Sequence, residues 1–157
     1  METTKQVSVF LENKPGRLAQ LLSALAGEKV NVVALSIMDS HEHSVLRLVT
    51  NDVKQTTQVL KTLNTHYTEA EVLMVELRNQ PGALAHVCEQ LAAEHVNIDY
   101  AYCSSGGRNG KVFGVFKVSN LEKAAKVLNS PTANSARRPE TRLRNRKISP
   151  TAKAPVR

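Results

Sequence analysis

The chain has 157 residues, of which 41% are hydrophobic and 4% aromatic, so we expect a globular core built from aliphatic side chains. No run of about 18 apolar residues occurs, which argues against a transmembrane helix, and the first ten residues lack a secretory pattern, so we expect a cytoplasmic protein. The net charge of +7 arises entirely in residues 130–157, because residues 1–129 hold thirteen basic and thirteen acidic side chains. The folded part therefore carries no net positive charge, which argues against nucleic-acid binding.

The hydrophobic periodicity of the first 71 residues predicts two helices and four strands. Alternating apolar and polar residues indicate strands, and apolar residues at helical spacing after Pro15 indicate a helix. Asp52 is a suitable cap for the second helix. The predicted order is strand, helix, strand, strand, helix, strand, over residues 7–11, 15–26, 31–38, 44–50, 52–63 and 67–71.

The same pattern occurs twice. A shift of 66 positions superposes twelve identical residues within a window of 23, and the shift becomes 68 after an insertion at 104–110, where a hairpin accommodates extra residues easily. The identical positions are Val9, Leu11, Asn13, Pro15, Gly16, Leu18, Ala19, Leu25, Ala26, Glu28, Val30 and Asn31. The chain is therefore a duplicated domain.

The repeated order βαββαβ predicts an α+β fold of two ferredoxin-like repeats, with antiparallel sheets and the helices on one face. We expect domains at 5–71 and 72–129 and a basic, disordered tail at 130–157. The second copy ends with a helix at about 121–129 and has no recognisable fourth strand. The strand at 72–77 should then have an unpaired edge.

The strand-to-helix junction carries Asn-x-Pro-Gly in both copies. Pro15 suits the first helical position, and Lys14, which precedes a proline, would be the N-cap. The backbone amides of Gly16, Arg17 and Leu18 would then be free at the positive end of the helix dipole, where a carboxylate can bind. Two alternatives remain open from the residues alone: Pro-Gly makes only a tight turn, or it forms an anion site.

Both copies resemble the ACT domain, a small regulatory module. The resemblance rests on the stretches NKPGRLAQLLSALAGEKVNVVAL and NQPGALAHVCEQLAAEHVNIDYAY and covers about residues 5–129. It implies side-by-side pairing of domains, with an amino acid held between the junction of one domain and the second strand of its neighbour. Asn stands at 13 and 79, where many family members have Asp. The ligand-binding residues expected from the junction and the resemblance are Asn13, Pro15, Gly16, Arg17, Leu18, Asn31, Val32, Asn79, Pro81, Gly82, Ala83, Leu84, Asn97 and Ile98.

We therefore expect a stand-alone tandem regulatory protein rather than an enzyme, in which a bound amino acid stabilises the pairing of domains. The expected partners are a second copy of the chain and an unidentified regulated enzyme, but neither a membrane nor nucleic acid. No cofactor or metal is expected, because His41 and His43 are too few for a site and Cys88 and Cys103 have no metal-ligand spacing.

Two alternative functions follow from the same sequence. RNA-binding domains share the βαββαβ order, and Phe10, Tyr100, Tyr102 and Phe113 should all point away from the helices, where bases could stack on them. The simpler explanation is that these aromatic residues pack where two sheets meet. The second alternative is a structural adaptor that uses the same sheets and binds no ligand.

Overall fold

The computed structural model describes residues 1–38, 43–104 and 111–130. Our expectations for the basic tail, for any strand beyond residue 130 and for most of the 104–110 insertion lie outside these residues. Within them the elements are β1 (Glu2–Glu12), α1 (Arg17–Gly27), β2 (Val32–Met38), β3 (His43–Thr50), α2 (Val53–Thr62), β4 (Tyr67–Arg78), α3 (Ala83–Ala93), β5 (Ile98–Cys103), β6 (Lys111–Val118) and α4 (Leu121–Asn129).

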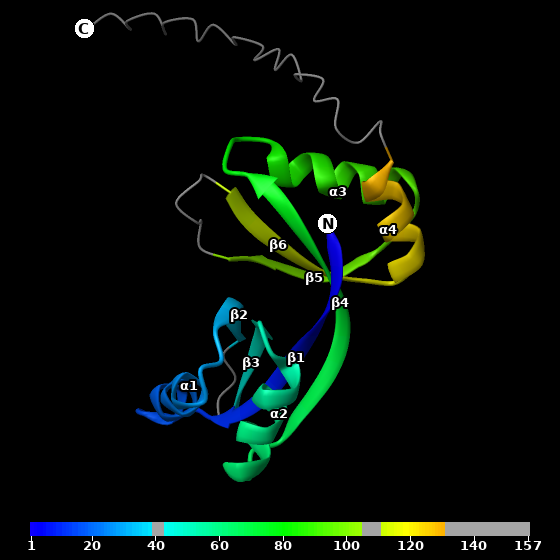
Figure 1. The fold of residues 1–157 in the computed structure, drawn as a ribbon. Coiled ribbons are helices and arrows are strands. Elements are labelled where there is room, and N and C mark those ends of the chain that lie inside the picture. The colour runs from blue at the N-terminus through cyan, green and yellow to red at the C-terminus, as the bar shows by residue number, and fades with distance from the viewer. Residues whose placement is uncertain (39–42, 105–110, 131–157) are drawn as a thin grey trace, which may run out of the picture.

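The described strands form one antiparallel sheet in the order β2-β3-β1-β4-β6-β5. Helices α1 and α2 cover the first half of this sheet, around β2 and β3, and α3 and α4 cover the second half, around β5 and β6 (Figure 1). The predicted α+β fold of two ferredoxin-like repeats is confirmed. The observed helix α4 has the bounds that the sequence predicted.

The central strands β1 and β4 belong to both halves. They pair without interruption from Glu2 opposite Met74 to Val9 opposite Tyr67. Lys5 pairs with Glu71, which is also its counterpart in the second repeat, so a pseudo-twofold axis passes between these two residues. The predicted domain boundary after Glu71 therefore falls within one continuous strand.

The expectation of an unpaired edge along residues 72–77 is wrong for Val72–Met74. The first residues of β1, Glu2–Thr4, pair with them and take the place of a fourth strand in the second half. Nothing in the local pattern Glu-Thr-Thr indicates this pairing, because the segment has no apolar alternation. The protein thus protects the edge with its own N-terminal segment.

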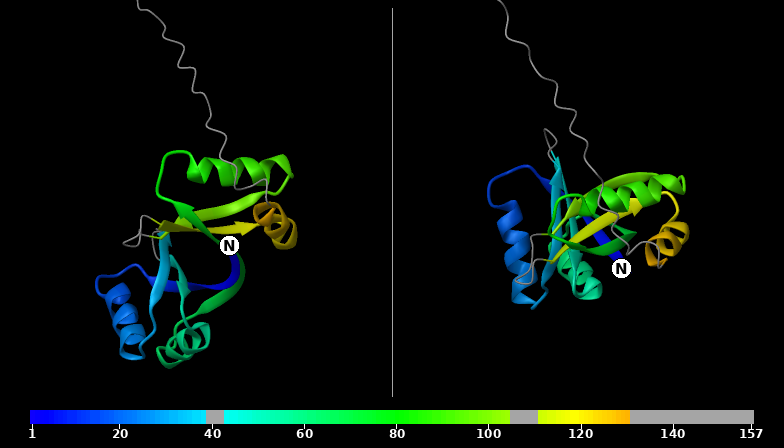
Figure 2. Two further views of the ribbon diagram at one scale, coloured as in Figure 1. Left: turned by 45° about the horizontal axis from the view of Figure 1, so that its top comes forward. Right: turned by 90° about the horizontal axis from the view of Figure 1, so that it is seen from above.

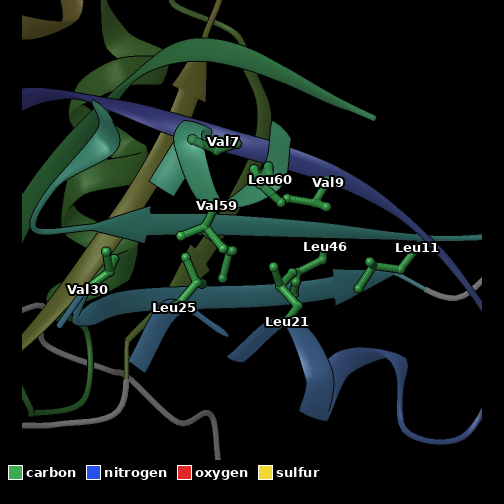
Figure 3. Packing of buried hydrophobic residues seen from close by; sticks show 10 residues of the cluster. Val7, Val9, Leu11, Leu21, Leu25, Val30, Leu46, Val59 and Leu60 are labelled. Atoms are coloured by element: carbon green, nitrogen blue, oxygen red, sulfur yellow. The ribbon is translucent and has the colours of Figure 1, made fainter. Parts of the chain in front are cut away.

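Each half has its own apolar core between the helices and the sheet. In the first half, Leu21 and Leu25 of α1 point toward the strands, and Figure 3 shows them close to Leu46 and Val59. In the second half, Leu91 of α3 and Phe116 of β6 are fully buried. The alternation of apolar residues along β1 and β4 therefore corresponds to the sheet face that the helices cover.

The opposite face of the sheet curls onto itself, so that the helices lie on the outside of the molecule (Figure 2). We call this face the concave face. A third apolar cluster, in addition to the two cores, lies on this face and joins both halves. It consists of Ala34, Val49, Val72, Met74 and Val115, with Val33, Tyr102 and Phe113 packed against it. The simpler explanation of the aromatic residues is thus confirmed for Tyr102 and Phe113. Phe10 remains 42% exposed.

Gln6 is the polar centre of the concave face and has no exposed surface. Its side-chain amide donates to the Tyr100 hydroxyl at 2.8 Å and to the Ser8 hydroxyl at 3.0 Å, and its Oε1 accepts from the Tyr102 hydroxyl at 3.0 Å. Burial raises the pKa of Tyr102, so its hydroxyl keeps its proton and can donate at neutral pH. The Arg47 guanidinium lies over the Tyr100 ring, 4.1 Å from its centroid, and adds a second contact between the halves.

We predict that Gln6→Ala lowers the free energy of unfolding by about 2–3 kcal/mol, because two tyrosine hydroxyls between the halves lose their partner. Urea denaturation followed by circular dichroism measures this value. Gln58→Ala, on the exposed side of α2, is the matched control and should change stability by no more than about 0.5 kcal/mol. Equal midpoints for the two variants would show that the Gln6 contacts do not stabilise the fold.

Candidate functional site

Each Asn-x-Pro-Gly junction forms a tight turn that ends in a left-handed glycine. Gly16 has φ 86° and ψ −17°, and Gly82 has φ 86° and ψ −13°. The Arg17 amide donates to the Lys14 carbonyl at 3.3 Å, and the Ala83 amide donates to the Gln80 carbonyl at 3.3 Å. These angles fit the third residue of a type II turn, a position that favours glycine.

The predicted start of the first helix is therefore wrong by two residues. Gly16, not Lys14, is the N-cap, and Pro15 lies in the turn rather than in the first helical position. The reason is that a residue at positive φ cannot continue a right-handed helix. The Arg17 amide, which we expected to be free, is used to close the turn. The second repeat has the same arrangement at Gly82.

The two helices that follow these turns begin without a side-chain cap. In the described residues, neither α1 nor α3 has a capping side chain or an acidic residue in its first turn. The other two helices are capped in the usual way, since Asp52 accepts from the Gln55 amide and Asn120 from the Lys123 amide, both at 2.9 Å. The N-cap residues of α1 and α3 thus supply no side-chain acceptor, whereas those of α2 and α4 do.

The predicted residues of the second strands lie far from the turns of their own repeat. Asn31 precedes β2, and helix α1, with 11 residues and a length of roughly 16 Å, separates it from Gly16. The backbone amide of Asn31 donates to Asn51 Oδ1 at 2.8 Å, and the backbone amide of Asn97 donates to the Ser119 hydroxyl at 3.1 Å. These bonds fix the start of each second strand to the loop before the following helix.

The structure places the other predicted residues as follows. Asn13 and Asn79 lie in bends after β1 and β4, and Pro15 and Pro81 are exposed in the turns. Leu18 and Val32 pack against the first core, Ile98 packs against the second, Ala83 is half-buried, and Leu84 is 43% exposed. Within one repeat, then, the turn residues are together, while the second-strand residues lie at the other end of the helix.

A surface pocket of about 350 Å³ opens beside the start of α1. We call it the α1 pocket. Its lining residues come from the end of β1, the first turns of α1 and the loop between α2 and β4; they are Phe10, Leu11, Glu12, Arg17, Gln20, Leu21, Leu63, Asn64, Thr65 and His66. Of these, the sequence analysis singled out only Arg17 as a ligand-binding residue. The loop residues carry no motif, and their approach to Arg17 is a tertiary contact.

Three charged side chains meet at the mouth of the α1 pocket. Glu12 Oε2 accepts from Arg17 Nη2 at 2.8 Å and from Arg17 Nε at 3.2 Å, and Lys14 Nζ lies 3.3 Å from the same oxygen. The hydrogen bond from Arg17, followed by that from Lys14, lowers the pKa of the Glu12 carboxyl below its ordinary value. Two cations against one carboxylate leave a positive balance next to the uncapped helix.

The described residues show no centre for metal binding. They contain no cluster of three or more His, Cys, Asp or Glu side chains that could hold a metal ion, while His41 lies outside them. Cys88 and Cys103 are free thiols. None of the described helices is long and apolar enough to cross a membrane.

Comparison with known proteins identifies a matching family and solved structures of similar fold. The family model described as "ACT domain pair" matches residues 2–134. Protein BT0572 from Bacteroides thetaiotaomicron is 36% identical, with a TM-score of 0.74, over 80% of this chain and 86% of that one. The ligand-free regulatory subunit of aspartate kinase from Thermus thermophilus is 11% identical, with a TM-score of 0.63, over 86% and 99% of the two chains.

The corresponding subunit from Thermus flavus is 12% identical, with a TM-score of 0.55, over 81% and 93% of the two chains. At this identity the two kinase subunits are similar in fold alone. None of the curated proteins searched matches the sequence. The comparisons give no support to RNA binding, and two of the four aromatic residues that it would use pack inside the concave face.

We predict that Gly16→Ala and Gly82→Ala each lower the free energy of unfolding by about 1–2 kcal/mol, the cost of a left-handed conformation for an L-residue. Steric overlap adds no further destabilisation, because a Cβ at either position meets no atom within 4 Å. Gly27→Ala, at a helical position with equal space, is the control and should be neutral or stabilising by up to about 1 kcal/mol. Urea denaturation of the three variants checks this, and a neutral Gly16→Ala would contradict the turn assignment.

We predict that Arg17→Gln raises the pKa of Glu12 toward its ordinary value, and that Lys14→Gln raises it less, because Arg17 makes the stronger hydrogen bond. Since the folded-state pKa is depressed, the ion pair stabilises the protein above the unfolded-state pKa, and this contribution is lost as the pH falls through the folded-state value. An NMR titration of the Glu12 carboxyl carbon measures both shifts. A larger effect of Lys14→Gln would reverse the assignment of the dominant partner.

Proposed function

The chain belongs to the ACT domain pair family, and on this basis we propose that it is a cytoplasmic regulatory protein that binds a small amino acid. The proposed ligand-binding positions are the two turns at Gly16 and Gly82 together with the second-strand residues that the family resemblance implies. Binding changes the association of domains rather than performing chemistry. The affected partner is an enzyme that the protein regulates.

The observation that carries this proposal is the contrast between the four helix starts. The two helices after Pro-Gly turns have no side-chain cap, whereas Asp52 and Asn120 cap the other two. A helix start that has no side-chain cap but has a positive dipole favours a carboxylate. The same unusual start in both repeats is what an amino-acid site at each junction requires.

The proposed ligand lies between two chains. Within one repeat the turn and the second strand are at opposite ends of a helix, so a ligand that contacts Gly16 needs a second strand from elsewhere. A second copy of the chain can bring Asn31 or Asn97 to that position. The ligand then stabilises the dimer by its higher affinity for the paired arrangement, which is a shift of population.

We predict that one or a few of the twenty amino acids raise the melting temperature of the protein in a thermal-shift screen. A ligand at 100 times its Kd adds about 2.7 kcal/mol to the free energy of unfolding, which at about 2–4 °C per kcal/mol raises the melting temperature by roughly 5–11 °C for a chain of this size. Gly16→Ala and Gly82→Ala carry the same backbone strain. The variant at an occupied turn should lose the ligand-induced rise, and Gly27→Ala should keep it.

Sedimentation velocity with and without the active amino acid completes this test. The proposal expects the ligand to increase the dimer fraction. If no amino acid changes the melting temperature, the sensor function is wrong, and a dimer that forms without any ligand response would indicate the structural adaptor instead.

A further inference from the structure

The two repeats share the backbone of the junction but differ in the side chains around it. Glu12 and Arg17, which line the α1 pocket, correspond to Arg78 and Ala83 in the second repeat. Gln20, on the next turn of α1, corresponds to His86. The charged groups at the mouth of the α1 pocket are therefore a property of the first repeat only.

We propose that the α1 pocket binds a small carboxylic acid with an aliphatic body. Its carboxylate pairs with Arg17, and its aliphatic part covers the leucines at the pocket floor. This inference rests on the proposed function, to which it adds the place and the chemical class of the ligand. It also assigns the first repeat as the one that selects the ligand.

The floor of the α1 pocket is apolar and well packed. Leu21 is 2% exposed, Leu11 is 8% exposed, and Leu63 is half-buried beside them. The volume of about 350 Å³ lies at the lower end of the range of about 300–1,000 Å³ that is typical of small-molecule sites. A floor of this kind favours an aliphatic group over a polar one.

The loop that forms the far wall is fixed before any ligand binds. The Phe10 amide donates to the His66 carbonyl at 3.0 Å, which ties the loop to β1. The Thr65 amide donates to the Leu60 carbonyl at 2.9 Å and the Asn64 amide to the Lys61 carbonyl at 3.0 Å, which close the end of α2. A preformed wall lowers the ordering cost of binding.

The rim of the pocket favours an anion. Arg17 and Lys14 share one oxygen of Glu12, and the adjacent helix start has no acidic residue. Because this ion pair is exposed to solvent, it contributes little to stability, and a ligand carboxylate can displace Glu12 from Arg17 at little cost. Arg17 then offers two parallel donors to the ligand, the geometry in which a guanidinium holds a carboxylate.

Isothermal titration calorimetry on the full chain tests this proposal with three probes that share one carbon skeleton: leucine, 4-methylpentanoate and 3-methylbutylamine. Leucine and 4-methylpentanoate should bind, and the amine should not. Arg17→Gln and Gln20→Glu should each raise the Kd for leucine at least tenfold. Gln20 is exposed on α1, so Gln20→Glu tests the charge of the pocket without disturbing the core.

Arg78→Gln is the matched control, because it removes one positive charge just before the junction of the second repeat, and it should leave the Kd unchanged. The proposal is overturned if the amine binds as tightly as leucine, or if both pocket variants bind like the wild type. If a different amino acid binds and its effect depends on Gly16 or Gly82 alone, the proposed function stands and the α1 pocket is excluded. If no amino acid binds at all, both fail.

Discussion

The ladder between β1 and β4 is the contact on which the rest of the molecule depends. Both strands run through both halves, and Lys5 and Glu71 pair at the pseudo-twofold axis. The end of β1 at Leu11 contributes to the first core, while its beginning at Glu2–Thr4 completes the sheet of the second half. Neither half can thus bury its own core and close its own sheet without the other. In the described residues the second copy has three strands of its own, and the first copy supplies the edge that pairs with Val72–Met74.

Closure of the concave face follows from this ladder and explains why the aromatic residues do not form an open platform. Gln6 lies next to the axis and reaches Tyr100 and Tyr102 on the far edge strand β5. A buried amide with all its hydrogen bonds formed is favourable only where its partners hold fixed positions. The two halves therefore pack as one body through their sheets. The helices and the junctions at Gly16 and Gly82 remain on the outside.

The features that the sequence predicted are those that local physics controls. The repeat, the type of each element, the Asp52 cap and the bounds of α4 all follow from periodicity or from a single side chain. The start of α1 was missed because Pro-Gly suits both a first helical turn and a type II turn, and only the chain path beyond Glu12 decides between them. The pairing of Glu2–Thr4 and the α1 pocket were missed for another reason. Both join segments about 50 to 70 residues apart that carry no shared pattern.

The architecture also limits how a ligand can act. No linker separates the halves, because β1 and β4 cross from one to the other as continuous strands, so the halves can move apart only by bending or breaking that ladder. A ligand that works by changing how domains pair is therefore unfavourable between the two halves of one chain. Separating the halves would break several ladder hydrogen bonds and the Gln6 contacts, and the free energy of these contacts opposes the change. The outer surfaces around the Gly16 and Gly82 turns carry no such restraint. In the proposed function, domain pairing therefore acts between copies of the chain, with each pair of halves moving as one unit.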